Sequence, residues 1–361
     1  MSGYIPTLDG WRAVAICMVI AYHMLFGLVP KESTPFFIVS QGAKGVDIFF
    51  ALSGFLITFR LMDEQKVAGA ISLRQFYLRR AFRILPPYLA YLAILSVLAW
   101  LGLVTLTRRE LLGCLLFVRN YLPAPDIDNW FTAHFWSLSV EEHFYLFWPL
   151  ILLVFSPASA RRVAVVLAIS VPIWRKVDVH YHLISPYGMG RTDWNIDALL
   201  WGAFLALLVH PPEKRALIAR WLTPTIWCAL VLTLMATTWF QPPGYLAMQA
   251  FLMPWMILGT VLNPHFWWSG VLESPVFRWV GRLSYSLYIW QQLCISGIWP
   301  RIEFLSYLPA TAANLLLGFL ATFLFGAVSH CALERPLMRV GKRILSGTSR
   351  KPPPGSSSLD P

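Results

Sequence analysis

The chain has 361 residues, of which 57% are hydrophobic and 13% are charged, and its formal net charge is +11. Ordinary soluble domains carry about 25% charged residues, so this composition excludes a typical soluble protein. It predicts an all-α, polytopic membrane protein whose helices face lipid and one another.

Ten stretches of the sequence, most of them roughly 17–23 residues long, are apolar enough to be predicted as helices that cross a bilayer. In chain order they fall at 13–29, 46–62, 84–104, 136–155, 162–175, 194–209, 221–239, 245–263, 283–300 and 308–330. A shorter apolar stretch, 105–122, predicts an interfacial or re-entrant piece. We therefore expect one bundle of about ten transmembrane helices within a single domain, residues 1–345.

The basic residues indicate how this bundle lies in the membrane. Most of the 29 Lys and Arg residues fall on one side if both termini are cytoplasmic, as the positive-inside bias requires. The positive charge thus predicts topology and attraction to anionic lipids or ligands, and not binding to nucleic acid. The Pro-, Ser- and Gly-rich segment 346–361 predicts a disordered cytoplasmic tail.

Arg12 directly precedes the first apolar stretch, which contains His23. Eleven residue steps make three helical turns plus about 20°, so both side chains lie on one stripe, about 16 Å apart along the axis. Ile16 and Val19 share that stripe. One interpretation is that Arg12 is a membrane anchor and His23 a hydrogen-bonded core residue. The other is that the two residues mark a polar pathway or site, as ionisable groups inside a membrane often do.

Two carboxylates are predicted at about the depth of His23, in the outer half of the bundle. Glu141 lies in "FWSLSVEEHFYLFWP", and Asp47 lies at the start of "GVDIFFALSGFLIT". Because Glu141 and Glu142 are 100° apart on a helix, we expect only one of them, Glu141, to face the site. A role in folding alone stays open for Asp47 and Glu142.

A cationic patch is predicted at the opposite, cytoplasmic level. In "QFYLRRAFRILPPY", Arg83 follows Arg79 by four residues and Arg80 by three, which places all three on one helix face near Arg12. These residues are either membrane anchors or a clamp for a polyphosphate, which arginine binds in bidentate fashion. An anion clamp inside and a base about 16 Å deeper fit acyl-coenzyme A, with its thioester directed to His23.

At these residues the chain resembles the acyltransferase-3 family of membrane O-acyltransferases, which includes O-antigen and exopolysaccharide acetylases. The resemblance rests on "LDGWRAVAICMVIAYH", "GVDIFFALSGFLIT", "RRAFRILPPY", "FWSLSVEEHFYLFWPL", "LSYSLYIWQQ" and "ERPLMR", which follow in the family's order. It implies a ten-helix core that takes an acyl group, usually acetyl, from cytosolic acyl-CoA. The implied acceptor is a hydroxyl, commonly on a glycan that faces away from the cytosol.

The resemblance also implies roles for individual residues. Arg12 and His23 match the family's signature pair, Glu141 matches the glutamate of its serine-containing motif, and Arg80 and Arg83 match the basic motif associated with the donor. Two positions depart from the common pattern. Relatives often have His where this chain has Gln291, and Gln where it has His143. The short tail predicts a member without an extracytoplasmic hydrolase-like domain.

The leading hypothesis is therefore an O-acetyltransferase of the cell inner membrane that modifies a polysaccharide such as lipopolysaccharide. His23 is the expected general base, oriented by Glu141 with help from Asp47, or else the carrier of an acyl-histidine intermediate. Arg12, Arg79, Arg80 and Arg83 are expected to hold the coenzyme A phosphates. No tightly bound cofactor or metal is expected, and the partners are acyl-CoA, the glycosylated acceptor, membrane lipids and polysaccharide biosynthesis machinery.

The alternative is a non-enzymatic transporter or flippase of a lipid-linked sugar, in which the buried charges form a permeation path. The acceptor and the acyl length are left open by the sequence. The segment "GMGRTDWNIDALLWG", residues 188–202, predicts either a packing network or a lining for the acceptor cleft.

Overall fold

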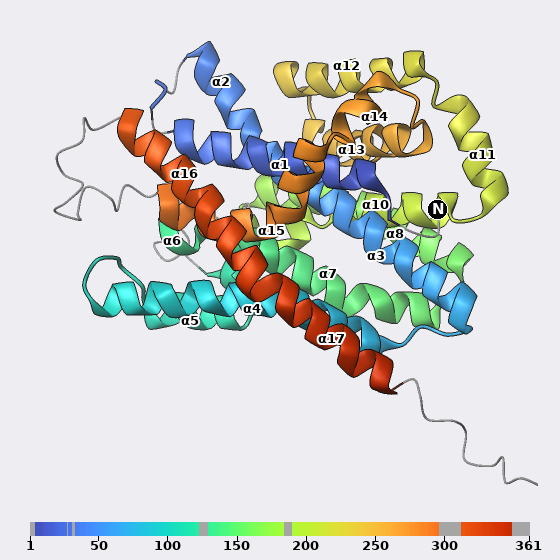
Figure 1. Cartoon of the computed structure of the whole chain (residues 1–361). Coiled ribbons are helices and arrows are strands. Elements are labelled where there is room, and N and C mark those ends of the chain that lie inside the picture. Colours follow the sequence, from blue (N-terminus) through green and yellow to red (C-terminus); the bar gives the residue numbers. More distant parts are fainter. Residues whose placement is uncertain are drawn as a thin grey trace, which may run out of the picture.

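The computed structural model describes residues 4–26, 28–30, 33–122, 129–183, 190–295 and 312–348, and in these residues it has helices and no β-strand. The predicted tail from 346 onwards lies outside these residues except for its first three, which continue the last helix. The elements, shown in Figure 1, are α1 (Pro6–Leu25), α2 (Thr34–Ser40), η1 (Gln41–Lys44), α3 (Gly45–Ala68), α4 (Leu73–Trp100), α5 (Arg108–Leu115), η2 (Arg119–Tyr121), α6 (Trp130–Ala133), α7 (Phe135–Val154), α8 (Pro157–Tyr181), α9 (Thr192–Asn195), α10 (Asp197–Val209), α11 (Pro212–Trp221), α12 (Pro224–Phe240), α13 (Tyr245–Leu262), α14 (Trp267–Leu272), α15 (Pro275–Ile295), α16 (Ala312–Ser329), the π-helical η7 (His330–Glu334) and α17 (Arg335–Thr348).

The all-helical class is confirmed, whereas the count of ten spans stays a prediction. Every predicted stretch overlaps a helix, but among the described residues only six helical segments are long and apolar enough to cross a membrane. A seventh is added if α11 and α12, which meet at a 76° bend, form one span. The 13 residues of α10 reach only about 20 Å against a hydrocarbon core of about 30 Å.

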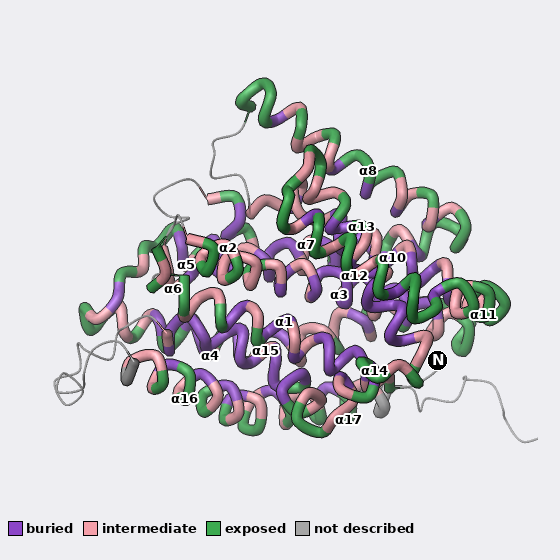
Figure 2. The backbone as a smooth tube through the Cα atoms, turned by 90° about the horizontal axis from the view of Figure 1, so that it is seen from above, coloured by how far each residue is buried: buried purple, intermediate pink, exposed green. Residues whose placement is uncertain are grey.

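Closely packed helices form the centre of the bundle. A side-chain carbon added at Gly54 of α3 would collide with the backbone of Leu199 in α10, and one at Gly202 would collide with Ala51. Glycines at such positions let membrane helices approach closely. Figure 2 shows the resulting distribution, with buried backbone concentrated in α1, α3 and α10 and exposed stretches along α8, α11 and α16.

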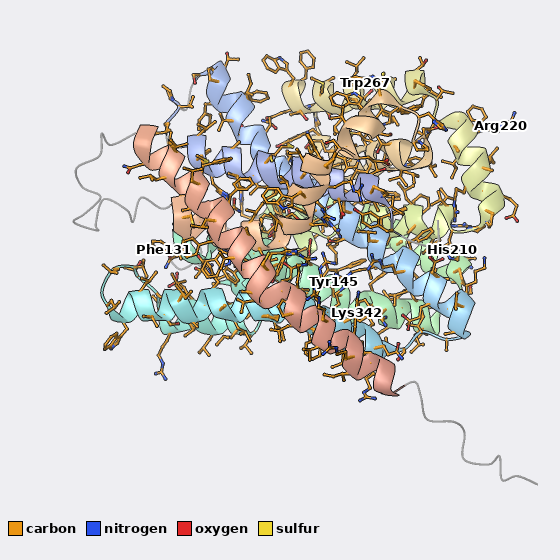
Figure 3. All side chains as sticks on the ribbon, in the orientation of Figure 1. Phe131, Tyr145, His210, Arg220, Trp267 and Lys342 are labelled. Carbon is orange, nitrogen blue, oxygen red and sulfur yellow. The ribbon has the colours of Figure 1, made fainter. Side chains whose placement is uncertain are left out.

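Aromatic and charged side chains are found both in the interior of the bundle and on its outside. Figure 3 places Tyr145 in the middle of the bundle, whereas Arg220 and Trp267 lie on its outside. Trp267 is 70% exposed, as expected for an aromatic residue at a membrane–water boundary. In Figure 1, α1 begins while α3 and α17 end toward the same, right-hand side, as the predicted topology requires, and the assignment of that side to the cytosol stays a prediction.

Candidate active site

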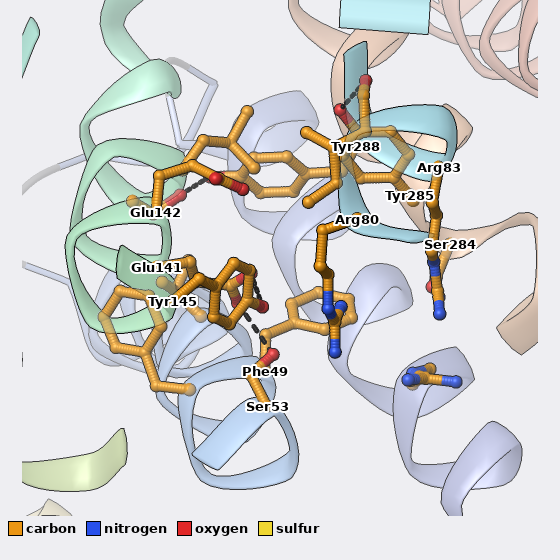
Figure 4. Close-up of a pocket in the computed structure, with 16 residues that line it drawn as sticks. Phe49, Ser53, Arg80, Arg83, Glu141, Glu142, Tyr145, Ser284, Tyr285 and Tyr288 are labelled. Atoms are coloured by element: carbon orange, nitrogen blue, oxygen red, sulfur yellow. Dashed lines mark hydrogen bonds between the residues drawn. The ribbon is translucent and has the colours of Figure 1, made fainter. Parts of the chain in front are cut away.

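A cavity of about 690 Å³, a volume that includes its open mouth, lies at the centre of the bundle, with lining residues from α1, α3, α4, α7 and α15. Three arginines, Arg12, Arg80 and Arg83, reach it from two helices, and two carboxylates, Glu141 and Glu142, reach it from α7. Figure 4 shows Arg80 and Arg83 extending in the same direction from α4, beside the group formed by Glu141 and its neighbours. The expectation that Arg12, Arg80 and Arg83 lie together is therefore confirmed.

The three arginines of the cavity differ in how they are held. Arg12 forms an ion pair with Asp9, with 3.1 Å between Nη1 and Oδ1. The guanidinium of Arg80 lies over the ring of Tyr145, 4.7 Å from its centroid. Arg83 makes no hydrogen bond or ion pair with any described residue, so its charge is available to a ligand.

Arg79 does not join this cavity. Its Nη2 lies 2.6 Å from Oε2 of Glu64, and its side chain lines a second cavity of about 450 Å³ together with Arg60. Arg80 and Arg83 line both cavities. The predicted patch of Arg79, Arg80 and Arg83 therefore lines the second cavity, and Arg60, which the sequence analysis does not include among the site residues, joins it there.

Glu141 is held inside the first cavity by two hydroxyl donors. Ser53 of α3 donates to Oε1 at 3.1 Å, and Tyr145, one turn along α7, donates to Oε2 at 2.6 Å. The prediction that Glu142 faces away from the site is wrong, because Glu142 also lines the cavity. The reason is the width of the cavity, which extends around α7 beyond a single helical stripe.

His23 lies beyond the end of the cavity that Tyr288 lines, and it is not among the lining residues. Its Nδ1 is 3.3 Å from Oε1 of Gln291, and its Nε2 is 3.4 Å from Nε2 of Gln292. Gln291 lies one turn beyond Tyr288, which does line the cavity. The prediction of a direct pairing between His23 and Glu141 is therefore wrong: the end of α15 supplies the partners of the imidazole.

Asp47 contacts neither the cavity that contains Glu141 nor the residues around His23. It forms an ion pair with Lys44, with 3.5 Å between Nζ and Oδ2, at the start of α3. Its neighbour by sequence, Val46, lines the cavity, but Asp47 does not. No contact in the structure supports the expected help of Asp47 in orienting His23, because the carboxylate pairs with Lys44 at the end of η1.

A chain of buried polar groups leads from the cavity to His23. Oγ of Ser137 and the hydroxyl of Tyr288, both cavity residues, are 2.6 Å apart, and Tyr288 donates to the carbonyl of His134 at 3.1 Å. The ring of His134 lies 2.5 Å from Oε1 of Gln292, which in turn contacts His23. Sequence reasoning missed His134 and Gln292, although two adjacent glutamines in an apolar stretch are a signal of a buried polar site.

The acidic segment near α9 forms a packing network. Asp193 pairs with Arg191 at 3.0 Å and accepts a hydrogen bond from Trp174 at 2.7 Å, while Asp197 pairs with Arg175 across α8 and α10. Of the two interpretations of this segment, the contacts support the network that joins α8, α9 and α10.

Comparison with known proteins identifies the family. The model of a family described as an acyltransferase domain matches residues 5–331. The chain belongs to this acyltransferase family. The match includes every residue of the two cavities and the residues around His23, so the site described above lies wholly within the family's domain.

Curated relatives of this acyltransferase are bacterial. The peptidoglycan O-acetyltransferase OatA of Listeria monocytogenes is 28% identical over 94% of this chain and 56% of its own length. A Staphylococcus aureus (strain COL) protein with a provisional O-acetyltransferase name is 26% identical over 95% of this chain and 59% of its own. The chain thus spans less than three-fifths of the length of these relatives. No solved structure matches it.

Proposed function

We propose that this chain is a multi-pass membrane O-acyltransferase that moves an acyl group, most simply acetyl, from cytosolic acyl-CoA to a hydroxyl of a glycan on the other side of the membrane. The observation that carries this proposal is the cavity in which Arg12, Arg80 and Arg83 converge inside an acyltransferase domain. Family membership favours this reaction over the alternative of a transporter or flippase.

The charges around the two cavities support a phosphorylated donor. Coenzyme A carries its negative charges on one end, and arginine binds phosphate in bidentate fashion. Arg83 has no partner among the described residues, and Arg80 and Arg83 lie between the two cavities, where phosphates can bind from the side of Arg60 and Arg79. The pantetheine arm then extends along the first cavity toward Tyr288.

In this proposal His23 is the general base. Its imidazole takes the proton of the acceptor hydroxyl as the oxygen attacks the thioester carbon. The carbon–sulfur bond then breaks, and the imidazolium returns the proton to the sulfur, which leaves as the coenzyme A thiol. General-base catalysis of this kind contributes about 10²–10⁴ in rate. The thioester approaches His23 when the contact between Ser137 and Tyr288 at the outer end of the cavity opens.

Glu141 takes a different part from the one expected from sequence. Tyr145 donates a hydrogen bond to Glu141 and carries the guanidinium of Arg80 on its ring face. Through Tyr145 the carboxylate fixes the position of Arg80, and its negative charge balances the cation. We therefore assign Glu141 to positioning the donor site and not to the imidazole.

The acceptor follows from the relatives and not from the cavity. OatA is named for O-acetylation of peptidoglycan. A cell-wall glycan hydroxyl is accordingly favoured over a hydroxyl of lipopolysaccharide for this chain. The bacterial inner membrane, where a cytosolic donor and an external glycan are both within reach, is the proposed location.

The test is transfer of labelled acetyl from acetyl-CoA to peptidoglycan fragments by the purified chain in lipid nanodiscs. His23→Ala is expected to abolish transfer, and His265→Ala, which changes an exposed histidine in a loop, is the matched control. Normal transfer by His23→Ala at equal protein amount would refute the assignment. Movement of a glycan lipid across the bilayer without consumption of thioester would favour the transporter instead.

A further inference from the structure

Two adjacent glutamines at the end of α15 contact the two ring nitrogens of His23, one glutamine at each nitrogen. Gln291 is fully buried and Gln292 is 2% exposed, although both lie in a stretch that is otherwise apolar. Trp130 anchors this end of the helix by donating from its indole to the backbone carbonyl of Gln292 at 2.7 Å, and its ring meets the edge of His23 with centroids 5.4 Å apart. Most buried amide groups make hydrogen bonds, so their partners are informative. Among the described residues, Nε2 of Gln291 has no partner, whereas the other three amide atoms of the two glutamines each have one.

One donor in this cluster has a fixed identity. The backbone N–H of His134, at the start of α7, lies 3.2 Å from Gln292. A backbone N–H donates and never accepts, so the side-chain atom of Gln292 that faces it is the oxygen Oε1. The amide nitrogen of Gln292 therefore faces His23.

The protonation of His23 follows from that orientation. The amide of Gln292 donates to Nε2 of His23 at 3.4 Å, so Nε2 carries a lone pair and no proton. A neutral imidazole has one donor and one acceptor nitrogen. The proton of His23 must then be on Nδ1, where Oε1 of Gln291 is ready to accept it at 3.3 Å.

We infer that Gln291 and Gln292 are positioning residues that hold His23 as the neutral Nδ1–H tautomer, with Nε2 as the nitrogen that takes the proton from the acceptor hydroxyl. His134 completes the arrangement, because its ring and its backbone both donate to Oε1 of Gln292 and prevent the amide from turning over. The long contact from Gln292 to Nε2 is the one that an incoming hydroxyl replaces. This inference rests on the proposed function for its catalytic meaning.

The arrangement differs from a carboxylate–histidine pair in its charge. A carboxylate on Nδ1 stabilises the imidazolium that forms when the base takes a proton. Gln291 fixes the tautomer and the ring orientation in the same way but brings no negative charge. Without a nearby negative charge the His23 imidazolium is not strongly stabilised. The ring can therefore accept a proton and return it within one reaction, but it does not remain positively charged.

The tautomer is measurable without turnover, by ¹⁵N NMR of the full chain in nanodiscs with labelled histidine. The His23 signals are assigned by their loss in His23→Ala. We expect a protonated Nδ1 and an unprotonated Nε2. In Gln292→Glu, which places a carboxylate oxygen against Nε2, we expect Nε2 to gain a proton. A wild-type His23 with its proton on Nε2 overturns the inference.

Kinetics with acetyl-CoA provide the second readout. Gln291→Leu, which removes the acceptor from Nδ1, is expected to lower kcat roughly 10- to 100-fold with KM for acetyl-CoA unchanged, because misorientation of a reacting group has effects of this size. Gln291→Glu keeps an oxygen acceptor and is expected to restore the tautomer and most of kcat. Unchanged kcat and tautomer in Gln291→Leu overturn the inference.

Ser286→Ala is the matched control for stability, since it removes a buried hydrogen bond, to Glu334, from the same helix without touching His23. The two proposals fail separately. If His23→Ala retains transfer, the proposed function fails whatever the tautomer. If His23→Ala abolishes transfer but the proton lies on Nε2, only the inference about the glutamines fails.

Discussion

Replacing Arg83 with glutamine removes a charge from both cavities without breaking a hydrogen bond or ion pair to any described residue. Arg83 lines the two cavities and makes no hydrogen bond or ion pair with a described residue. Loss of the Arg83 side chain is therefore expected to leave folding unchanged and to weaken only the binding of the donor. We expect Arg83→Gln to raise KM for acetyl-CoA and to leave kcat nearly unchanged.

The size of this effect follows from the interaction that is lost. A hydrogen bond to a charged group contributes about 1.5–3 kcal/mol. Since about 1.4 kcal/mol corresponds to a factor of ten, the expected rise in KM is roughly 10- to 150-fold. Added salt screens such interactions, so the ratio between variant and wild type should shrink as ionic strength rises.

The assay is initial-rate transfer from acetyl-CoA and from acetyl-dephospho-CoA, with thermal unfolding as a check on folding. Arg74→Gln is the control, because Arg74 is an exposed arginine of the same helix and the charge change is identical. An unchanged KM in Arg83→Gln, or a rise as large in Arg74→Gln, would refute the reasoning. A loss of kcat at constant KM would place Arg83 at the chemistry and not at the phosphates.

Three further outcomes follow from the contacts of other residues. Glu141→Gln should weaken the hold on the donor site and lower kcat/KM roughly 10-fold or more, because charge-assisted hydrogen bonds are about twice as strong as neutral ones, and equal kinetics would contradict this role. Gly54→Ala should lower thermal stability, since the added carbon meets the backbone of Leu199 and overpacking costs about 1–3 kcal/mol; an unchanged melting temperature would show that α3 can move away. Arg175→Met should destabilise the chain by about 3–5 kcal/mol by leaving Asp197 buried without its partner, and Arg175→Met with Asp197→Leu should recover most of it, as measured by thermal unfolding.

Helical periodicity predicted which residues share a face. Arg12 and His23 lie on one helix, and Ile16 and Val19 between them are 0% and 1% exposed, as the single stripe requires. Arg80 and Arg83 line one cavity, as expected from their spacing. These predictions succeed because the helix repeat is fixed by backbone geometry and does not depend on neighbouring helices.

Pairings between helices were not predictable in the same way. The partner of Glu141 on α3, Ser53, is 88 positions away in the chain, and Gln291 is 268 positions away from His23. Depth in the membrane placed His23 and Glu141 at one level, but depth does not specify which side chain fills the space between two helices. That choice depends on how closely the backbones pack, which is set by contacts such as Gly54 with Leu199.

The placement of Arg80 and Arg83 between the two cavities makes them a shared wall. An anion bound in one cavity partly neutralises the charge of Arg80 and Arg83 and so weakens their attraction for an anion in the other cavity. Anion binding in the two cavities is therefore coupled through these two guanidinium groups. Coenzyme A that stays bound through its phosphates after the reaction would thus weaken binding of the next acyl-CoA. The turnover rate would then depend on the release of coenzyme A as well as on the chemical step.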